Sequence, residues 1–85
     1  MTYRVDLKPR AKRDIRHIPK DEATRIADAL ERLADGLKGD VRRLTNFTPE
    51  YRLRVGSYRV LFEVEDKERI VVYRILHRRE AYRRR

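Results

Sequence analysis

The sequence predicts an α+β domain in which a helical hairpin packs on one face of a mainly antiparallel sheet. Between residues 9 and 37, apolar residues recur at helical spacing, whereas after residue 40 apolar and polar residues alternate as they do in strands. Helices are thus grouped early in the chain and strands late. The 85 residues are expected to form a single domain, residues 1–85.

The first half predicts one short strand and two helices. Residues 3–7 alternate as a half-buried strand does, and Pro9 is well placed as the first residue of a helix that Pro19 ends. A second helix is expected to begin near Asp21 and to end at the glycines 36 and 39. Its predicted apolar stripe consists of Ala23, Ile26, Ala27, Leu30, Leu33, Ala34 and Leu37.

The second half predicts four strands. Residues 51–55 and 58–65 alternate on either side of Gly56 and Ser57, which is a strong hairpin signal. Residues 41–44 form a short candidate edge strand, and residues 69–76 are apolar enough for a central strand covered on both faces. Residues 46–50 are expected to be a loop, and the polar tail after residue 76 to form one or two helical turns.

The composition excludes several classes of protein. The chain has no cysteine, which excludes disulfides and thiolate metal sites and favours a reducing, intracellular setting. No segment approaches the roughly 18 apolar residues of a membrane span, so we expect a cytoplasmic protein without membrane contact. No cluster of Asp, Glu and His predicts a metal site, and we expect no cofactor.

Positive charge is concentrated in the second half of the chain. The formal net charge is +9, of which residues 1–40 carry +2 and residues 41–85 carry +7. The basic residues after residue 40 are 12 arginines and a single lysine. Part of this bias is background, since arginine also outnumbers lysine in the first half, but a guanidinium suits phosphate recognition and the excess favours a polyanionic partner.

The strand alternation places three arginines on the sheet face away from the helices. Arg52 and Arg54 alternate with apolar neighbours in one strand, and Arg59 does so in the next. A single arginine on a solvated sheet face needs no functional explanation, but several together, with only Glu63 and Glu80 as obvious counter-charges, predict anion binding. Further residues that could join the cluster are Arg74, His77, Arg78, Arg79 and Tyr82.

The run YRLRVGSYRVLFEV at residues 51–64, followed by a strand and by HRREAYR at residues 77–83, resembles the RelE/ParE toxin superfamily. The resemblance covers the whole chain and implies the family's microbial ribonuclease fold. It also implies the toxin of a type II toxin–antitoxin system that cleaves messenger RNA in the ribosomal A site, without a metal, by attack of a ribose 2′-OH on the adjacent phosphate. The implied partners are the ribosome, messenger RNA and a RelB-like antitoxin, with which the toxin would form a hetero-oligomer that binds operator DNA.

The resemblance assigns roles to individual residues. Arg52 and Arg54 match a basic pair that is lysine in the best-known relatives, and Arg59 matches an arginine that stabilises the transition state. Arg79 matches an arginine that acts as an acid or stabilises the leaving group, and Tyr82 matches a tyrosine that stacks on the substrate base. Arginine is a poor general base. We therefore add the hypothesis that His77 takes the proton.

Three alternatives stay open at this point. A ParE-like toxin shares the fold but poisons DNA gyrase, although the basic C-terminal motif favours RNA cleavage. A non-catalytic RNA-binding or ribosome-binding domain would have the same basic charge. A degenerate toxin would fold and bind its antitoxin without cleaving RNA.

Overall fold

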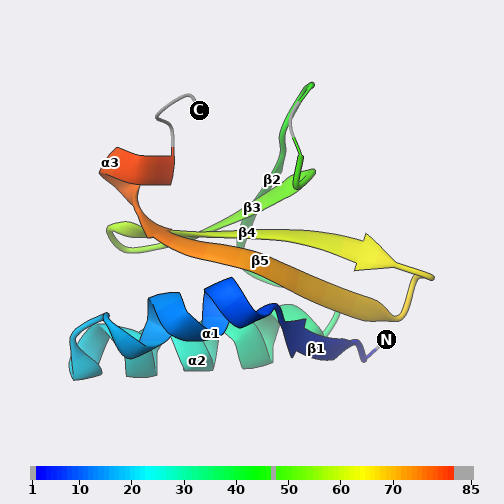
Figure 1. The fold of residues 1–85 in the computed structure, drawn as a ribbon. Helices are drawn as coiled ribbons and strands as arrows, with labels where there is room; N and C mark the ends of the chain where they lie inside the picture. Colours follow the sequence, from blue (N-terminus) through cyan, green and yellow to red (C-terminus); the bar gives the residue numbers. More distant parts are fainter. Residues whose placement is uncertain (1, 47, 82–85) are drawn as a thin grey trace.

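The computed structural model describes residues 2–46 and 48–81. In these ranges the chain forms five strands and three helices (Figure 1). In chain order they are β1 (Arg4–Leu7), α1 (Pro9–Arg16), α2 (Lys20–Ala34), β2 (Asp40–Arg43), β3 (Tyr51–Val55), β4 (Tyr58–Glu65), β5 (Arg69–His77) and α3 (Arg78–Ala81).

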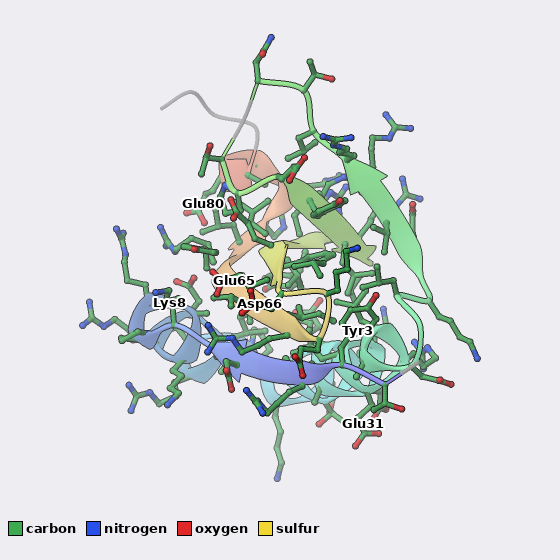
Figure 2. The ribbon with its side chains drawn as sticks, turned by 90° about the vertical axis from the view of Figure 1, so that its right-hand side faces the viewer. Tyr3, Lys8, Glu31, Glu65, Asp66 and Glu80 are labelled. Carbon is green, nitrogen blue, oxygen red and sulfur yellow. The ribbon has the colours of Figure 1, made fainter. Side chains whose placement is uncertain are left out.

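All five strands form one sheet in the order β1-β5-β4-β3-β2. The pairs β2–β3, β3–β4 and β4–β5 are antiparallel, and β1 joins the edge of β5 in parallel. In Figure 2, β1 crosses the front of the molecule between Tyr3 and Lys8, and Glu65 and Asp66 mark the turn between β4 and β5. The predicted α+β class with a mainly antiparallel sheet is confirmed.

The helices α1 and α2 cover one face of the sheet and run in opposite directions (Figure 1). Pro9 is the first residue of α1, as predicted, because its fixed φ suits a helix start. The core between these helices and the sheet contains Ala11, Ile26, Ala29, Leu30, Leu33, Leu53, Val55, Val60, Phe62, Ile70, Val72 and Ile75.

The apolar stripe of α2 differs from the predicted one. Ala29 is buried and Ala27 is exposed, so the stripe that faces the sheet is rotated by part of a turn. The helix also ends at Ala34, before Leu37. Gly36 and Leu37 take positive φ angles of 82° and 61°, which break the helical path while Leu37 still packs against the core.

Asp14 of α1 covers the part of β5 that extends beyond β1. Its carboxylate accepts hydrogen bonds from Arg74 Nε at 2.8 Å, from Arg74 Nη2 at 3.0 Å and from the Ile75 backbone N–H at 2.9 Å. Burial acts to raise the pKa of Asp14, but the hydrogen bonds from Arg74 and Ile75 and the positive charge of Arg74 outweigh it and lower the pKa below 3.8. One carboxylate therefore joins a helix to an otherwise open strand edge.

The helix α3 lies on the other side of the sheet from α1 and α2 (Figure 1). The Arg78 N–H donates to the Ser57 carbonyl at 2.7 Å and so fixes α3 to the β3–β4 turn, where Gly56 has a φ of 59°. The sheet face opposite α1 and α2 is called here the open face. It was expected to carry no helix, and the position of α3 shows that this expectation was wrong. Within the described ranges, no helix has the length and apolar character needed to cross a membrane.

Candidate functional site on the open sheet face

The strand register brings the three predicted strand arginines together on the open face. Arg54 lies directly opposite Arg59, and Arg52 lies opposite Leu61. Residues 52 and 54, like residues 59 and 61, are two apart and so point to the same side of the sheet. That side is the open one, because the alternate residues Leu53 and Val60 belong to the core beneath α1 and α2.

Arg52 is buried, although the sequence predicts a solvated side chain. Only 6% of it is exposed, and its Nη1 atom is buried without a hydrogen-bond partner among residues 2–46 and 48–81. A buried guanidinium donor is costly when it is unsatisfied, so this N–H is expected to have a partner, such as water or a ligand, beyond the described residues.

Arg59 is held firmly at the end of the hairpin. It is 7% exposed, and its Nη1 donates to the carbonyls of Gly56 and Tyr58, each at 2.9 Å. These bonds use the carbonyls of the β3–β4 turn to orient the guanidinium. Two cations placed directly opposite each other, here Arg54 and Arg59, destabilise a sheet unless negative charge lies nearby.

Part of that negative charge comes from residues that the sequence did not single out. Asp40 of β2 lies opposite Arg54, and its Oδ2 is 3.2 Å from Arg54 Nε. Arg74, which was expected to join the cluster, is instead bound to Asp14. Asp14 and Asp40 are distant in sequence from the arginines that they contact, so no local pattern could identify them.

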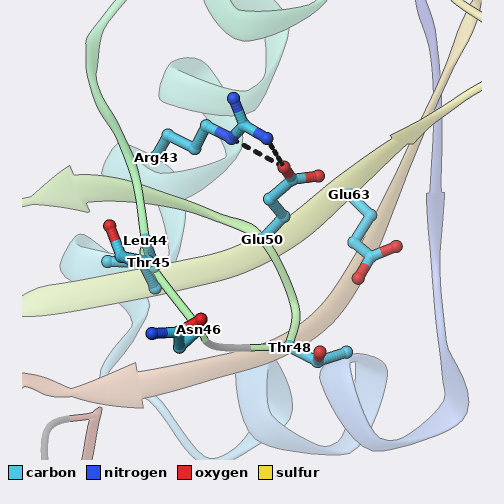
Figure 3. Close-up of a pocket in the computed structure, with 7 residues that line it drawn as sticks. All are labelled: Arg43, Leu44, Thr45, Asn46, Thr48, Glu50 and Glu63. Carbon is cyan, nitrogen blue, oxygen red and sulfur yellow. Dashed lines mark hydrogen bonds and ion pairs between the residues drawn. The ribbon is translucent and has the colours of Figure 1, made fainter.

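The other end of the open face carries carboxylates. Glu50 Oε2 accepts a hydrogen bond from Arg43 Nε at 2.6 Å, and Glu63 lies on β4 opposite Val71 (Figure 3). Both carboxylates border a hollow between β4 and the β2–β3 loop, which is lined by Arg43, Leu44, Thr45, Asn46, Thr48, Glu50 and Glu63. The arginine cluster thus lies toward the β3–β4 turn, whereas the hollow is bordered by the Arg43–Glu50 ion pair and by Glu63.

His77 lies apart from the arginines. It is opposite Tyr58, whereas Arg59 is opposite Leu76, so the side chain of His77 leaves the sheet on the side of α1 and α2. Its ring meets the Tyr58 ring edge-on, with the centroids 5.5 Å apart. Burial, together with the neighbouring Glu22 carboxylate, raises the pKa of this tyrosine. The expectation that His77 joins the open-face cluster is therefore wrong, because strand parity turns it away.

The predicted tail residues follow β5 directly. Arg79 belongs to α3, is exposed, and donates its backbone N–H to His77 Nδ1 at 3.3 Å. Arg78, the other arginine of that helix, is exposed as well. Tyr82 lies outside the described residues.

The chemistry available on the open face is that of organic cations and carboxylates. Within the ranges that the structure describes, no three His, Asp or Glu side chains are grouped so that they could hold a metal ion. Fixed guanidinium groups can bind a phosphate and stabilise charge that develops on it.

Comparison with known proteins identifies the family. The family model described as the ParE toxin of the type II parDE toxin–antitoxin system matches residues 5–82. A curated relative, toxin RelE3 of Methanocaldococcus jannaschii, is 32% identical over 75 residues, which are 82% of this chain and 84% of the relative.

Solved structures of similar fold are toxin–antitoxin complexes. The RelB–RelE complex of Methanococcus jannaschii contains a chain with a TM-score of 0.74 and 29% identity, and the match covers 89% of this chain and 93% of that one. The RelBE2 complex of Mycobacterium tuberculosis gives a TM-score of 0.77 at 22% identity, over 91% of this chain and 99% of that one, and so supports the fold alone. The matches in sequence and in structure together establish that this chain belongs to the RelE/ParE superfamily of type II toxins.

Proposed function

We propose that this toxin is a ribosome-dependent endoribonuclease that cleaves messenger RNA in the A site and so arrests translation in the cytoplasm. The observation that carries the proposal is the strand register that places Arg52, Arg54 and Arg59 on one face of the sheet. A phosphodiester supplies the anionic oxygens that such a group of donors binds. The named RelE relative supports RNA cleavage as the activity.

The proposed division of labour follows the placement of the arginines. Arg59, which the turn carbonyls orient, stabilises the charge that builds up on the phosphate in the transition state. Arg52 and Arg54 hold the same phosphate and its neighbour along the strand. Arg79 assists the departing 5′-oxygen, and Tyr82 stacks on a substrate base; both roles are taken from the family resemblance.

The arginines supply electrostatic stabilisation but no group that accepts a proton. A guanidinium stays protonated at every physiological pH and is therefore unsuited to removing the 2′-OH proton. The sequence suggests His77 for this step, but its side chain leaves the sheet on the opposite side from Arg59. We leave His77 out of the proposed proton transfer.

We also propose that a RelB-like antitoxin neutralises this protein. The supporting observation is that the structural relatives were solved as RelB–RelE complexes. A net charge of +9 favours an acidic partner segment. The assembly of the two proteins is proposed to bind operator DNA, a role taken from the family resemblance.

The decisive experiment maps the 3′ ends of messages after the toxin is induced. Wild-type toxin is expected to produce shortened messages cut at codons in the A site. A double variant, Arg59→Ala with Arg79→Ala, is expected to fold but to leave messages intact. Intact messages after wild-type induction would contradict the proposal.

A second candidate function, poisoning of DNA gyrase, is favoured by the ParE description of the matching family model. It predicts a DNA-damage response with messages of normal length. Following both readouts in the same induction experiment separates the two activities. Binding of RNA or ribosomes with neither response would indicate a non-catalytic domain.

A further inference from the structure

Glu63 of β4 presents a carboxylate on the same face as the arginines. Leu61 faces the open side opposite Arg52, and Glu63 follows it by two residues, so Glu63 points to that side as well. Glu63 is thus a diagonal neighbour of Arg52 across the β3–β4 pair. Side chains in this relation start roughly 7 to 8 Å apart, within reach of long residues.

The surroundings of Glu63 on the open face are partly apolar. Leu61 and Val71, its neighbours along β4 and across β5, are 6% and 4% exposed. Neither belongs to the core cluster beneath α1 and α2. Glu63 therefore stands at the border between a small apolar floor and the hollow shown in Figure 3.

Glu63 differs from two other acids of this region, Asp40 and Glu50, in having no ion-pair partner among the residues that the structure describes. Asp40 is paired with Arg54, and Glu50 is paired with Arg43. In contrast, Glu63 has neither a hydrogen bond nor an ion pair with any side chain of residues 2–46 and 48–81, and in Figure 3 its carboxylate lies beside the hollow, apart from the Arg43–Glu50 pair. A carboxylate without a cation partner keeps its lone pairs available to accept a proton.

We propose that Glu63 is the catalytic base of the toxin, an inference that rests on the proposed ribonuclease function. Its carboxylate takes the proton of the ribose 2′-OH while the 2′-oxygen forms a bond to the adjacent phosphorus. The bond from phosphorus to the 5′-oxygen breaks, and that oxygen keeps the electron pair and gains a proton from water, while the charge of Arg79 stabilises it. The products are a 2′,3′-cyclic phosphate and a 5′-hydroxyl, and Glu63 returns its proton to the solvent.

This assignment gives the open face both kinds of group that the reaction needs. The cations Arg52, Arg54 and Arg59 bind and stabilise the phosphate, and Glu63, on the next row of the same face, accepts the proton. The basic pair, Arg52 and Arg54, then needs no lysine, because neither residue has to accept a proton.

The first test measures single-turnover cleavage of a message in the A site of purified ribosomes. Glu63→Gln, which keeps the shape and removes the charge, is expected to lower the cleavage rate by about 100-fold or more, with little change in the concentration needed for half-maximal rate. Glu50→Gln, which alters the paired acid of the same hollow, is the matched control and is expected to cleave at close to the wild-type rate. A thermal melt of each variant checks that it is folded.

Chemical rescue separates a proton acceptor from a residue that only maintains structure. Glu63→Ala is expected to be slow and to recover at least about tenfold when formate replaces chloride at equal ionic strength, since formate supplies the missing carboxylate. Glu63→Asp, with a carboxylate one methylene shorter, is expected to retain part of the rate.

Three results would overturn the assignment: wild-type rates for Glu63→Gln, a slow Glu63→Ala that formate leaves unchanged, or a loss of cleavage in Glu50→Gln alone. Failure of the ribonuclease function itself looks different, because wild-type toxin would then yield no cyclic phosphate ends. Arg59→Ala is measured in parallel. If the Glu63 variants cleave at the wild-type rate, a slow Arg59→Ala shows that cleavage still depends on the arginines.

Discussion

At the scale of single residues, Arg52 is a charged side chain that is almost fully buried. The sequence predicts that Arg52 points away from α1 and α2, which is correct, because strand parity is a local property. It does not predict the burial of Arg52, because burial depends on what later parts of the chain place above the sheet. In the same way, no pattern within one strand could pair Arg74 with Asp14, which lies 60 residues away.

We expect Arg52→Met to abolish cleavage and to stabilise the fold. The substitution keeps a long side chain and removes a buried donor that has no partner in the described chain. The free energy of unfolding should rise by about 1 to 2 kcal/mol, measured by urea denaturation. Arg42→Met, at the exposed neighbouring position of the same row, should change it by no more than about 0.5 kcal/mol. A clear loss of stability in Arg52→Met would show that Arg52 supports the fold.

Asp14→Asn is expected to destabilise the protein by about 1 to 2 kcal/mol at neutral pH, because the charge-assisted bonds from Arg74 are lost. The pKa of Asp14 is lowered in the folded state, so its contribution is present above the ordinary value of 3.8 and is lost as the pH falls through the folded value. The difference between wild type and variant should therefore shrink below about pH 4. Denaturation curves at several pH values test this, and a difference that is constant down to pH 2 would be inconsistent with it.

At the scale of the elements, the hairpin of β3 and β4 follows from the sequence, whereas the partner of β1 does not. The alternation and the Gly56 turn are contained within 15 residues, residues 51–65. The parallel pairing of β1 with β5 joins opposite ends of the chain, and short patterns contain no signal for it. The sequence predicted one or two helical turns in the tail, where α3 lies. It did not predict that α3 lies above the sheet.

The rotated stripe of α2 gives a direct test of how the helix faces the sheet. Ala29→Glu is expected to destabilise the fold by at least about 2 kcal/mol, because it buries a carboxylate against the sheet. Ala27→Glu, two residues away on an exposed position, should change stability by no more than about 0.5 kcal/mol. Thermal and urea unfolding of the two variants compare them, and the reverse order would support the stripe that the sequence predicted.

At the scale of the whole molecule, charge is distributed between two unlike sides. The helix α2 carries four of the eight acids of residues 1–40, whereas the open face carries the cluster of arginines. This asymmetry is what the sequence does predict, since net charge by segment needs no knowledge of the fold. If the proposed RNA substrate is correct, this asymmetry should orient the protein so that the open face meets the RNA.

Binding to ribosomes or RNA is expected to weaken steeply with salt, because each phosphate contact releases counterions. Arg54→Gln should reduce the slope of log affinity against log salt by about 0.7 to 1, the value for one phosphate contact. Arg32→Gln, at an exposed position on α2, should leave the slope unchanged. Equal slopes for wild type and Arg54→Gln would mean that Arg54 makes no phosphate contact.

The pairing of β1 with β5 has a consequence for how the toxin is made. Arg4 lies opposite Arg69, which is synthesised 65 residues later. A nascent or truncated chain that stops before residue 69 lacks β5 and the α3 that follows it, and its β1 has no strand to join. Such a chain exposes an unpaired edge and part of its core, which marks it for proteolysis. A chain that stops before residue 69 is therefore expected to lack the complete sheet that carries the arginines.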